Sequence, residues 1–80
     1  MIFKLSEEKY NLFKHYVDFS EINIKMDDDK YTIEIEEKDL RLFQLLVSDA
    51  STTFGFDSNG EITDFGRKLE ALYDTIYSQS

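Results

Sequence analysis

Residues 6 to 19 carry apolar side chains at the three- and four-residue spacing of one helix face. This stripe consists of Tyr10, Phe13, Tyr16 and Val17, and it is widened by Leu12 and Phe19. Ser6 is a favourable N-cap, and Glu7 and Glu8 suit the positive end of a helix dipole. The pattern therefore predicts a helix over residues 6–19.

Residues 21 to 36 alternate between polar and apolar side chains with period two, which is typical of strands with one buried face. The apolar set is Ile22, Ile24, Met26, Tyr31, Ile33 and Ile35. A two-residue turn at Asp28-Asp29 would bring this whole set to one face of an antiparallel hairpin. That turn predicts four cross-strand pairs: Asp27 with Lys30, Met26 with Tyr31, Ile24 with Ile33, and Ile22 with Ile35. Asp-Asp is a weaker turn dipeptide than Asn-Gly, so a longer loop is the alternative.

Two further helices are predicted in the second half of the chain. The first, over residues 37–53, has a wide stripe made of Leu40, Phe43, Leu46, Val47 and Ala50, broadened by Leu42 and Leu45. A stripe this wide favours the most buried helix of the fold. After a loop at residues 54–60, Thr63 is expected to cap a helix from Asp64 to about Ser78.

The predicted order is α-β-β-α-α in a single small α+β domain spanning residues 1–80. Three helices would pack on one face of a two-stranded antiparallel hairpin, because each amphipathic element has to bury its apolar side against another. Eighty residues permit only a small core, and the 15% aromatic content supplies its bulk.

The chain contains no cysteine, which favours a reducing compartment for so small a domain. Its N-terminus lacks the apolar stretch of a signal peptide, and no apolar run approaches the ~20 residues that cross a bilayer. We therefore expect a cytoplasmic protein that does not act at a membrane.

Negative charge is concentrated in one part of the sequence. The net charge is −8, and residues 18–39 contribute −6 of it through nine acids against three lysines. This balance argues against direct nucleic-acid binding, because such affinity comes largely from cations that neutralise phosphates. It argues equally against anionic membranes and permits a protein partner with a basic surface.

The residues that usually carry chemistry are scarce. His15 is the only histidine, and no pattern places a nucleophile and a carboxylate around it. With no cysteine, a transition-metal site is not expected, and no glycine loop of phosphate-binding type is present. A core this small also leaves little room for a water-excluding pocket of ~300 Å³ or more. We therefore expect no enzymatic activity, no cofactor and no metal.

The segment from Asp57 to Asp64 partly resembles the middle of a calcium-binding EF-hand loop. The match fails at both anchoring positions, which fall on Gly55 and Gly66 where carboxylates are needed. A tight turn at Asn59-Gly60 that leads into a capped helix is the favoured interpretation. A degenerate Ca²⁺ site is retained as a hypothesis that a Ca²⁺-dependent rise in melting temperature would test.

Two smaller features have two interpretations each. Gly66 in the first turn of the last helix is either tolerated at a helix start, which is favoured, or marks close packing of another backbone. Phe54, Phe56 and Tyr77 lie outside the stripes, and they either close the end of the core, which is favoured, or mark an interface.

The sequence thus favours a non-enzymatic protein-binding module with an acidic hairpin. The expected contact residues are Glu21, Asp27, Asp28, Asp29, Glu34 and Glu36. In the sharpest form of this hypothesis the carboxylates imitate phosphates at a nucleic-acid site of the partner, as in small acidic inhibitors encoded by phages and mobile elements. The alternative is a homo-oligomeric structural or accessory protein with no ligand chemistry.

Overall fold

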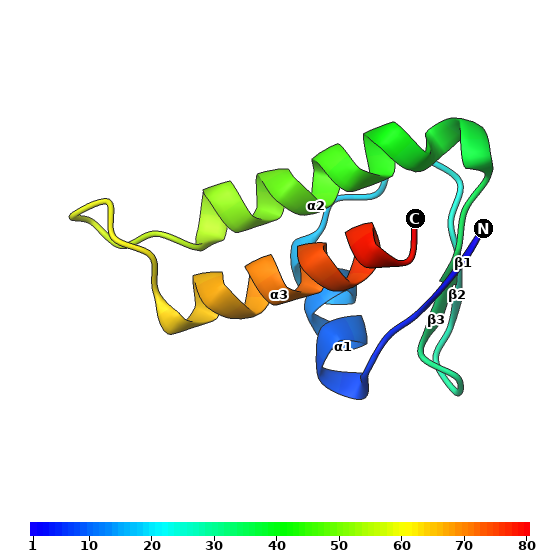
Figure 1. Cartoon of the computed structure of the whole chain (residues 1–80), viewed down its shortest axis with the longest axis horizontal. Coiled ribbons are helices and arrows are strands. Elements are labelled where there is room, and N and C mark those ends of the chain that lie inside the picture. Colours follow the sequence, from blue (N-terminus) through cyan, green and yellow to red (C-terminus); the bar gives the residue numbers. More distant parts are fainter.

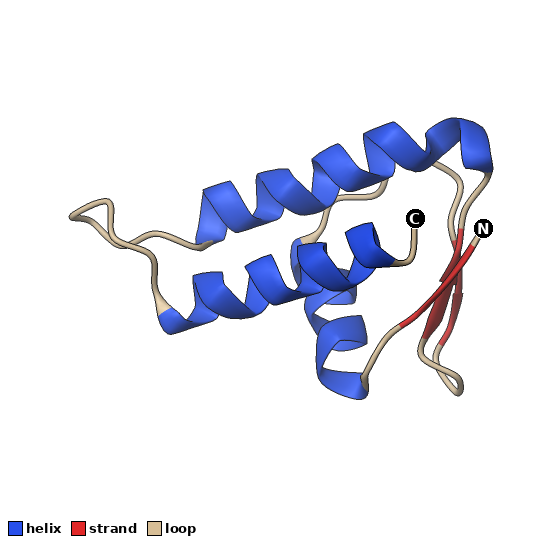
Figure 2. Ribbon diagram, viewed as in Figure 1, coloured by secondary structure: helices blue, strands red, loops and turns tan.

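The computed structural model describes all residues 1–80 and has an α+β fold, as predicted. Its elements in chain order are β1 (Ile2–Lys4), α1 (Glu7–Tyr16), β2 (Lys25–Asp27), β3 (Thr32–Glu34), the 3-10 helix η1 (Glu37–Asp39), α2 (Leu40–Phe54) and α3 (Asp64–Ser78). The helices α2 and α3 run antiparallel along the long axis of the molecule, and α1 crosses them (Figure 1). The sheet stands at one end of this helical layer (Figure 2). None of the helices has the length and apolar character needed to cross a membrane.

The predicted antiparallel hairpin is present as β2 and β3, but β1 adds a third strand, so the predicted two-stranded sheet and the order α-β-β-α-α were wrong. The strand order is β1-β3-β2 with both pairs antiparallel, and Phe3 of β1 lies opposite Ile33 of β3. Pairing continues beyond the strand, because the Leu5 N–H donates to the Tyr31 carbonyl at 3.0 Å. β1 is only three residues long, which is too short for period-two alternation to distinguish it from irregular chain.

The hairpin register differs from the predicted one by two residues. Met26 lies opposite Ile33 rather than Tyr31, because the connection is a four-residue loop and not a two-residue turn. The Asp27 carboxylate accepts from the backbone N–H groups of Asp29 at 2.9 Å and Lys30 at 3.1 Å. Tyr31 then adopts a left-handed φ of 54° that leads into β3. Since side chains alternate with period two, the shift leaves the apolar residues on the predicted face.

The helices largely follow the predicted boundaries. α1 ends at Tyr16 rather than residue 19, and the predicted second helix consists of η1 followed by α2, which extends to Phe54. Both predicted caps are present: the Ser6 side chain accepts from Lys9 N–H, and the Thr63 side chain accepts from Gly66 N–H.

The core joins the inner face of the sheet to all three helices. Its fourteen residues are Phe3, Leu5, Tyr10, Phe13, Val17, Ile22, Ile33, Ile35, Phe43, Val47, Ala50, Leu69, Leu72 and Ile76. The Phe43 ring of α2 lies 5.0 Å from the Phe3 ring of β1 and 5.4 Å from the Phe13 ring of α1. These contacts fix the sheet against the end of the helical layer.

The end of α2 and the start of α3 meet through two glycines. A Cβ added at Gly66 would lie 2.7 Å from the Cα of Gly55, closer than real Cβ atoms approach backbone. The Gly55 carbonyl also accepts from the Thr63 N–H at 2.8 Å and from the Thr63 hydroxyl at 3.1 Å. The favoured interpretation of Gly66 as merely tolerated was therefore wrong, and close backbone packing is observed.

The segment between α2 and α3 forms the predicted turn. Gly60 has a φ of 78°, which favours glycine, and the Asp57 carboxylate accepts from the N–H groups of Asn59 and Glu61. The Asp57 carboxylate is thus used inside the turn that leads to the Thr63 cap.

The outer edge of β1 is covered by the C-terminal end of the chain. The Gln79 side-chain amide accepts from the Lys4 N–H at 2.9 Å and donates to the Lys4 carbonyl at 2.8 Å. It therefore occupies the hydrogen-bonding positions that a neighbouring strand would use.

Candidate functional site

The six acidic residues predicted as contacts do not all line one hollow. Asp27, Asp28 and Asp29 lie together at the loop that joins β2 to β3, and Glu34 projects from the solvent-facing side of the sheet. Glu36 immediately precedes η1, and Glu21 lies in the connection between α1 and β2. The first four line one hollow, Glu34 and Glu36 line another, and Glu21 lines neither.

Lysines offset the acids on the solvent-facing side of the sheet. In one cross-strand row Glu34 lies between Ile2 and Lys25, and in the next Thr32 lies between Lys4 and Asp27. The hollow over this face, about 840 Å³ in volume, is lined by four acids and by Lys4, Lys25 and Lys30. The local balance is therefore −1, because β1 brings Lys4 beside a hairpin that is strongly acidic in the sequence.

Asp28 fastens the hairpin loop to α1. The buried Tyr10 hydroxyl donates to the Asp28 carboxylate at 2.5 Å, and the Lys14 ammonium lies 3.3 Å from the same oxygen. Burial, and then the bond to Asp28, raise the pKa of Tyr10 to about 12. The Tyr10 bond, and then Lys14, lower the pKa of Asp28. This carboxylate is consequently engaged within the molecule.

The six residues divide evenly by whether their carboxylates are engaged. Asp27 holds the loop backbone, Asp28 holds Tyr10, and Glu36 lies 3.4 Å from the Lys38 ammonium. The other three carboxylates are exposed and have no intramolecular hydrogen bond or ion pair; they belong to Glu21, Asp29 and Glu34. These three are the hairpin acids available to a partner.

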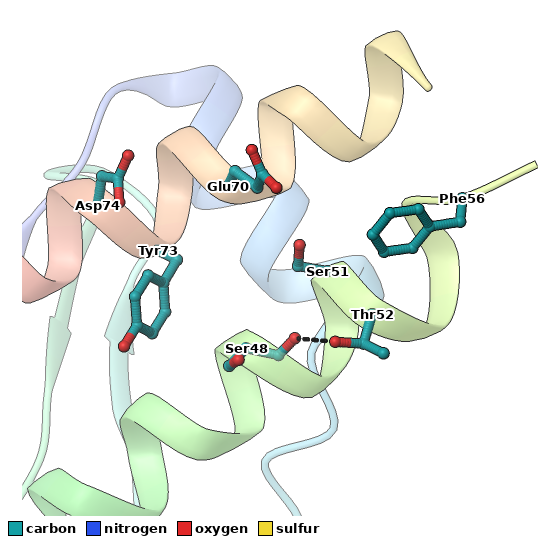
Figure 3. Close-up of a pocket in the computed structure, with 7 residues that line it drawn as sticks. All are labelled: Ser48, Ser51, Thr52, Phe56, Glu70, Tyr73 and Asp74. Carbon is teal, nitrogen blue, oxygen red and sulfur yellow. Dashed lines mark hydrogen bonds between the residues drawn. The ribbon is translucent and has the colours of Figure 1, made fainter. Parts of the chain in front are cut away.

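A second hollow, of about 350 Å³, lies between α2 and α3. Its lining residues, drawn in Figure 3, are Ser48, Ser51, Thr52, Phe56, Glu70, Tyr73 and Asp74. Figure 3 shows Tyr73 reaching from α3 toward α2, and Thr52 donates its hydroxyl to the Ser48 carbonyl at 3.3 Å. No histidine, lysine or arginine lines this groove, and its only charged residues are Glu70 and Asp74. It can offer hydrogen bonds and two carboxylates to a polar ligand.

His15 is not part of any cluster of metal-ligating side chains. His15 is exposed on α1 and makes no side-chain hydrogen bond. Nowhere do three histidine, aspartate or glutamate side chains converge on a common point that could hold a metal ion.

The three aromatic residues that the sequence placed outside its stripes are exposed. Phe54 and Phe56 are each 47% exposed and Tyr77 is 61% exposed, so these rings do not close the core as expected. Tyr16, which was assigned to the buried stripe of the first helix, is also 41% exposed. The early end of α1 explains this, because Tyr16 is its final residue and lies at the margin of the core.

No protein-family model, curated protein or solved structure matches this chain.

Proposed function

We propose that this protein is a non-enzymatic binding module that docks its acidic hairpin on a basic surface of another protein. In its sharpest form the partner's surface is a nucleic-acid site, and the carboxylates occupy the positions of phosphates. The module itself binds neither nucleic acid nor membranes and works in the cytoplasm, where a phage or mobile element would deploy such an inhibitor.

The unpaired carboxylates of Glu21, Asp29 and Glu34 carry this proposal. Each would gain an ion pair on docking without first breaking an internal one. The Asp28 contact to α1 holds the loop in place, which reduces the entropy lost on binding. Because lysines nearly balance the charge of the sheet face, contact is expected at the three free carboxylates themselves: Asp29 in the loop, Glu34 at the end of β3 and Glu21 before β2.

The test is affinity capture from a lysate on immobilised protein, with elution by a salt gradient and identification by mass spectrometry. The variant Glu21→Gln/Asp29→Asn/Glu34→Gln removes the three free hairpin charges. The control variant Glu61→Gln/Glu70→Gln/Asp74→Asn removes the same number of exposed charges elsewhere.

A partner that binds the parent and the control variant, elutes at moderate salt and is lost from the hairpin variant supports the proposal. Competition by DNA would support the phosphate-mimic form. Equal capture by both variants, or recovery of the bait alone, contradicts the proposal.

The alternative is a homo-oligomer, and the observation that favours it is the asymmetry of the sheet edges. Gln79 covers the edge of β1, whereas no backbone or side chain hydrogen-bonds the outer edge of β2 at Met26. Two copies could pair along β2 about a two-fold axis. Sedimentation across a dilution series distinguishes the two cases, because only the oligomer changes mass with concentration.

A further inference from the structure

Three helices each contribute one ring to an exposed cluster at the end of the molecule away from the sheet. Tyr16 of α1 packs edge-to-face against Phe54 of α2, with ring centroids 5.6 Å apart, and against Phe65 of α3, at 4.7 Å. We call these three residues the aromatic shelf. Because all three rings are attached to helices that share one core, the shelf is held in a fixed shape.

Tyr16 separates two hollows, and the charges around them differ. In the hollow on the α1–α3 side, Glu8 and Lys68 form an ion pair at 3.2 Å and cancel. The hollow on the α1–α2 side, about 340 Å³, has Tyr16, Leu46, Ala50 and Phe54 as its apolar lining and Asp18 and Asp49 as its charged residues. No lysine, arginine or histidine lines this α1–α2 hollow.

Both carboxylates of the α1–α2 hollow are available to a cation from another molecule. Asp18 accepts from the N–H and the hydroxyl of Ser20 at 3.1 and 2.8 Å, which orients the carboxylate and lowers its pKa. Asp49 has no hydrogen bond or ion pair. Both carboxylates therefore lie beside an exposed aromatic ring and have no cationic partner within the molecule.

The C-terminal end of α2 adds to the negative potential. A helix carries the equivalent of roughly half a negative charge at its C-terminus, and a basic side chain in the last turn commonly offsets it. The last turn of α2 has no basic residue, and that turn supplies Thr53 and Phe54 to the hollow. The two carboxylates and the C-terminal end of α2 thus all contribute negative electrostatic potential to the α1–α2 hollow.

We propose that the α1–α2 hollow binds an arginine side chain, together with a neighbouring large apolar residue, from a segment of another protein. The guanidinium would stack on the exposed rings of the shelf and pair with Asp18 and Asp49, while the apolar neighbour would cover Leu46 and Ala50. A second copy of this chain is a poor occupant, because each copy carries a net charge of −8. This proposal goes beyond the acidic hairpin and does not depend on it.

The test is selection from a random twelve-residue peptide library displayed on phage, with the parent protein as bait. We expect enriched peptides to share an arginine next to a leucine or an aromatic residue. A synthetic peptide of the consensus sequence would then be titrated calorimetrically. Its affinity should fall by about tenfold or more in Asp49→Asn and in Phe54→Ser, since such anchors dominate small interfaces.

Matched controls separate this surface from the rest of the molecule. Leu45→Ser removes a 55% exposed side chain on the same helix outside the hollow, and Glu70→Gln removes an exposed charge on α3. Both should bind the peptide as the parent does, and so should the hairpin variant Glu21→Gln/Asp29→Asn/Glu34→Gln. Because Asp49 is exposed, Asp49→Asn leaves the core intact and keeps the test valid if Phe54→Ser folds poorly.

Several results would overturn the proposal. These are enrichment of peptides without a cationic residue, no enrichment over an Asp49→Asn bait, and unchanged affinity in the Asp49→Asn variant. A concentration-dependent mass that Phe54→Ser abolishes would also overturn it, because a second copy would then cover the shelf.

Discussion

Tyr10 is a buried residue whose hydroxyl must find a polar partner. The side chain is 1% exposed, and its ring packs edge-to-face on Tyr31 at 5.6 Å. An unpaired hydroxyl in this position would cost free energy, and the Asp28 carboxylate prevents that cost. The aspartate that the sequence offers as a contact residue is thus the residue that allows a tyrosine, rather than a phenylalanine, in the core.

Tyr10→Phe should lower the free energy of unfolding by about 1 kcal/mol, because it removes a hydrogen bond to a charged but partly exposed acceptor. Chemical denaturation followed by circular dichroism measures this change. Tyr16→Phe is the matched control on the same helix, since the Tyr16 hydroxyl makes no hydrogen bond. An equal effect from both substitutions would contradict the role assigned to the Asp28 bond.

The same pair predicts how stability depends on pH. The pKa of Tyr10 is raised from 10.0 to about 12, so its stabilising contribution is complete below pH 10.0 and is lost as the pH rises toward 12. The pKa of Asp28 is lowered from 3.8, so its contribution is complete above that pH and is lost as the pH falls below it. The difference in unfolding free energy between parent and Tyr10→Phe should therefore shrink at both extremes. A difference that stays constant from neutral pH to pH 12 would contradict this.

At the scale of elements, the close approach between the end of α2 and the start of α3 depends on the absence of side chains at Gly55 and Gly66. The Cβ of any other residue at Gly66 would meet the backbone of Gly55, which cannot rotate away. The same contact lets Thr63 bond the Gly55 carbonyl and cap α3. One close approach therefore ends one helix and positions the next.

Gly66→Ala should destabilise the protein by about 2 kcal/mol, because overpacking costs about 1–3 kcal/mol and exceeds the gain in helix propensity. Gly60→Asn is the control, since nothing lies within 4 Å of an added Cβ and asparagine tolerates the φ of 78°. The control should cost no more than about 1 kcal/mol in thermal and chemical denaturation, which is the backbone cost of replacing glycine at a positive φ. Stabilisation by Gly66→Ala would show that the two backbones are not in contact.

Covering of the β1 edge can be measured at one amide. Gln79→Ala should speed hydrogen exchange of the Lys4 N–H by about fivefold, which corresponds to loss of about 1 kcal/mol of protection. Gln79→Glu keeps an acceptor for that N–H and should retain most of the protection. The Leu5 amide, which bonds to the Tyr31 carbonyl just before β3, should be unaffected by either change. Unchanged exchange at Lys4 in Gln79→Ala would contradict the edge role of Gln79.

The sequence predicted the elements whose signals are local. The stripes, the Ser6 and Thr63 caps and the Asn59-Gly60 turn all depend on residues within a few positions of each other. It did not predict β1, because Ile2–Lys4 is defined by its pairing with a strand about thirty residues away. The predicted hairpin register was also wrong, because the Asp27 side chain stabilises a four-residue loop rather than the predicted two-residue turn.

The candidate site was less predictable than the fold for the same physical reason. The concentration of acids is visible in the sequence, but Lys4, Lys14 and Tyr10 offset or engage them only after folding. The aromatic shelf joins three rings from three helices, and no periodicity brings Tyr16, Phe54 and Phe65 together.

At the scale of the whole molecule, repulsion among carboxylates opposes folding. The net charge is −8, and the three ion pairs are exposed, so each contributes little to stability. Salt screens the repulsion more than it weakens these pairs, because the repulsion sums over many charges at longer range.

Raising NaCl from low ionic strength to about 0.5 M should therefore increase the melting temperature by several degrees. The Debye length is already about 10 Å at about 0.1 M salt, so repulsion between distant carboxylates is largely screened at the higher concentration. The variant Glu21→Gln/Asp29→Asn/Glu34→Gln should melt higher than the parent at low salt and gain less from added NaCl. Thermal denaturation followed by circular dichroism tests both statements. A melting temperature that falls with salt would mean that the ion pairs outweigh the repulsion.

The hydrogen bonds between Lys4 and Gln79 bring the first strand and the end of the last helix next to each other. Because these residues are hydrogen-bonded neighbours, a few added residues could join the two ends of the polypeptide without disturbing β1 or α3. New ends could then be opened at the exposed Ser58-Asn59 turn, far from the sheet (Figure 1). The molecule is therefore well suited to circular permutation, which would move both termini to the far side of the fold and leave the hairpin free for labelling or immobilisation experiments.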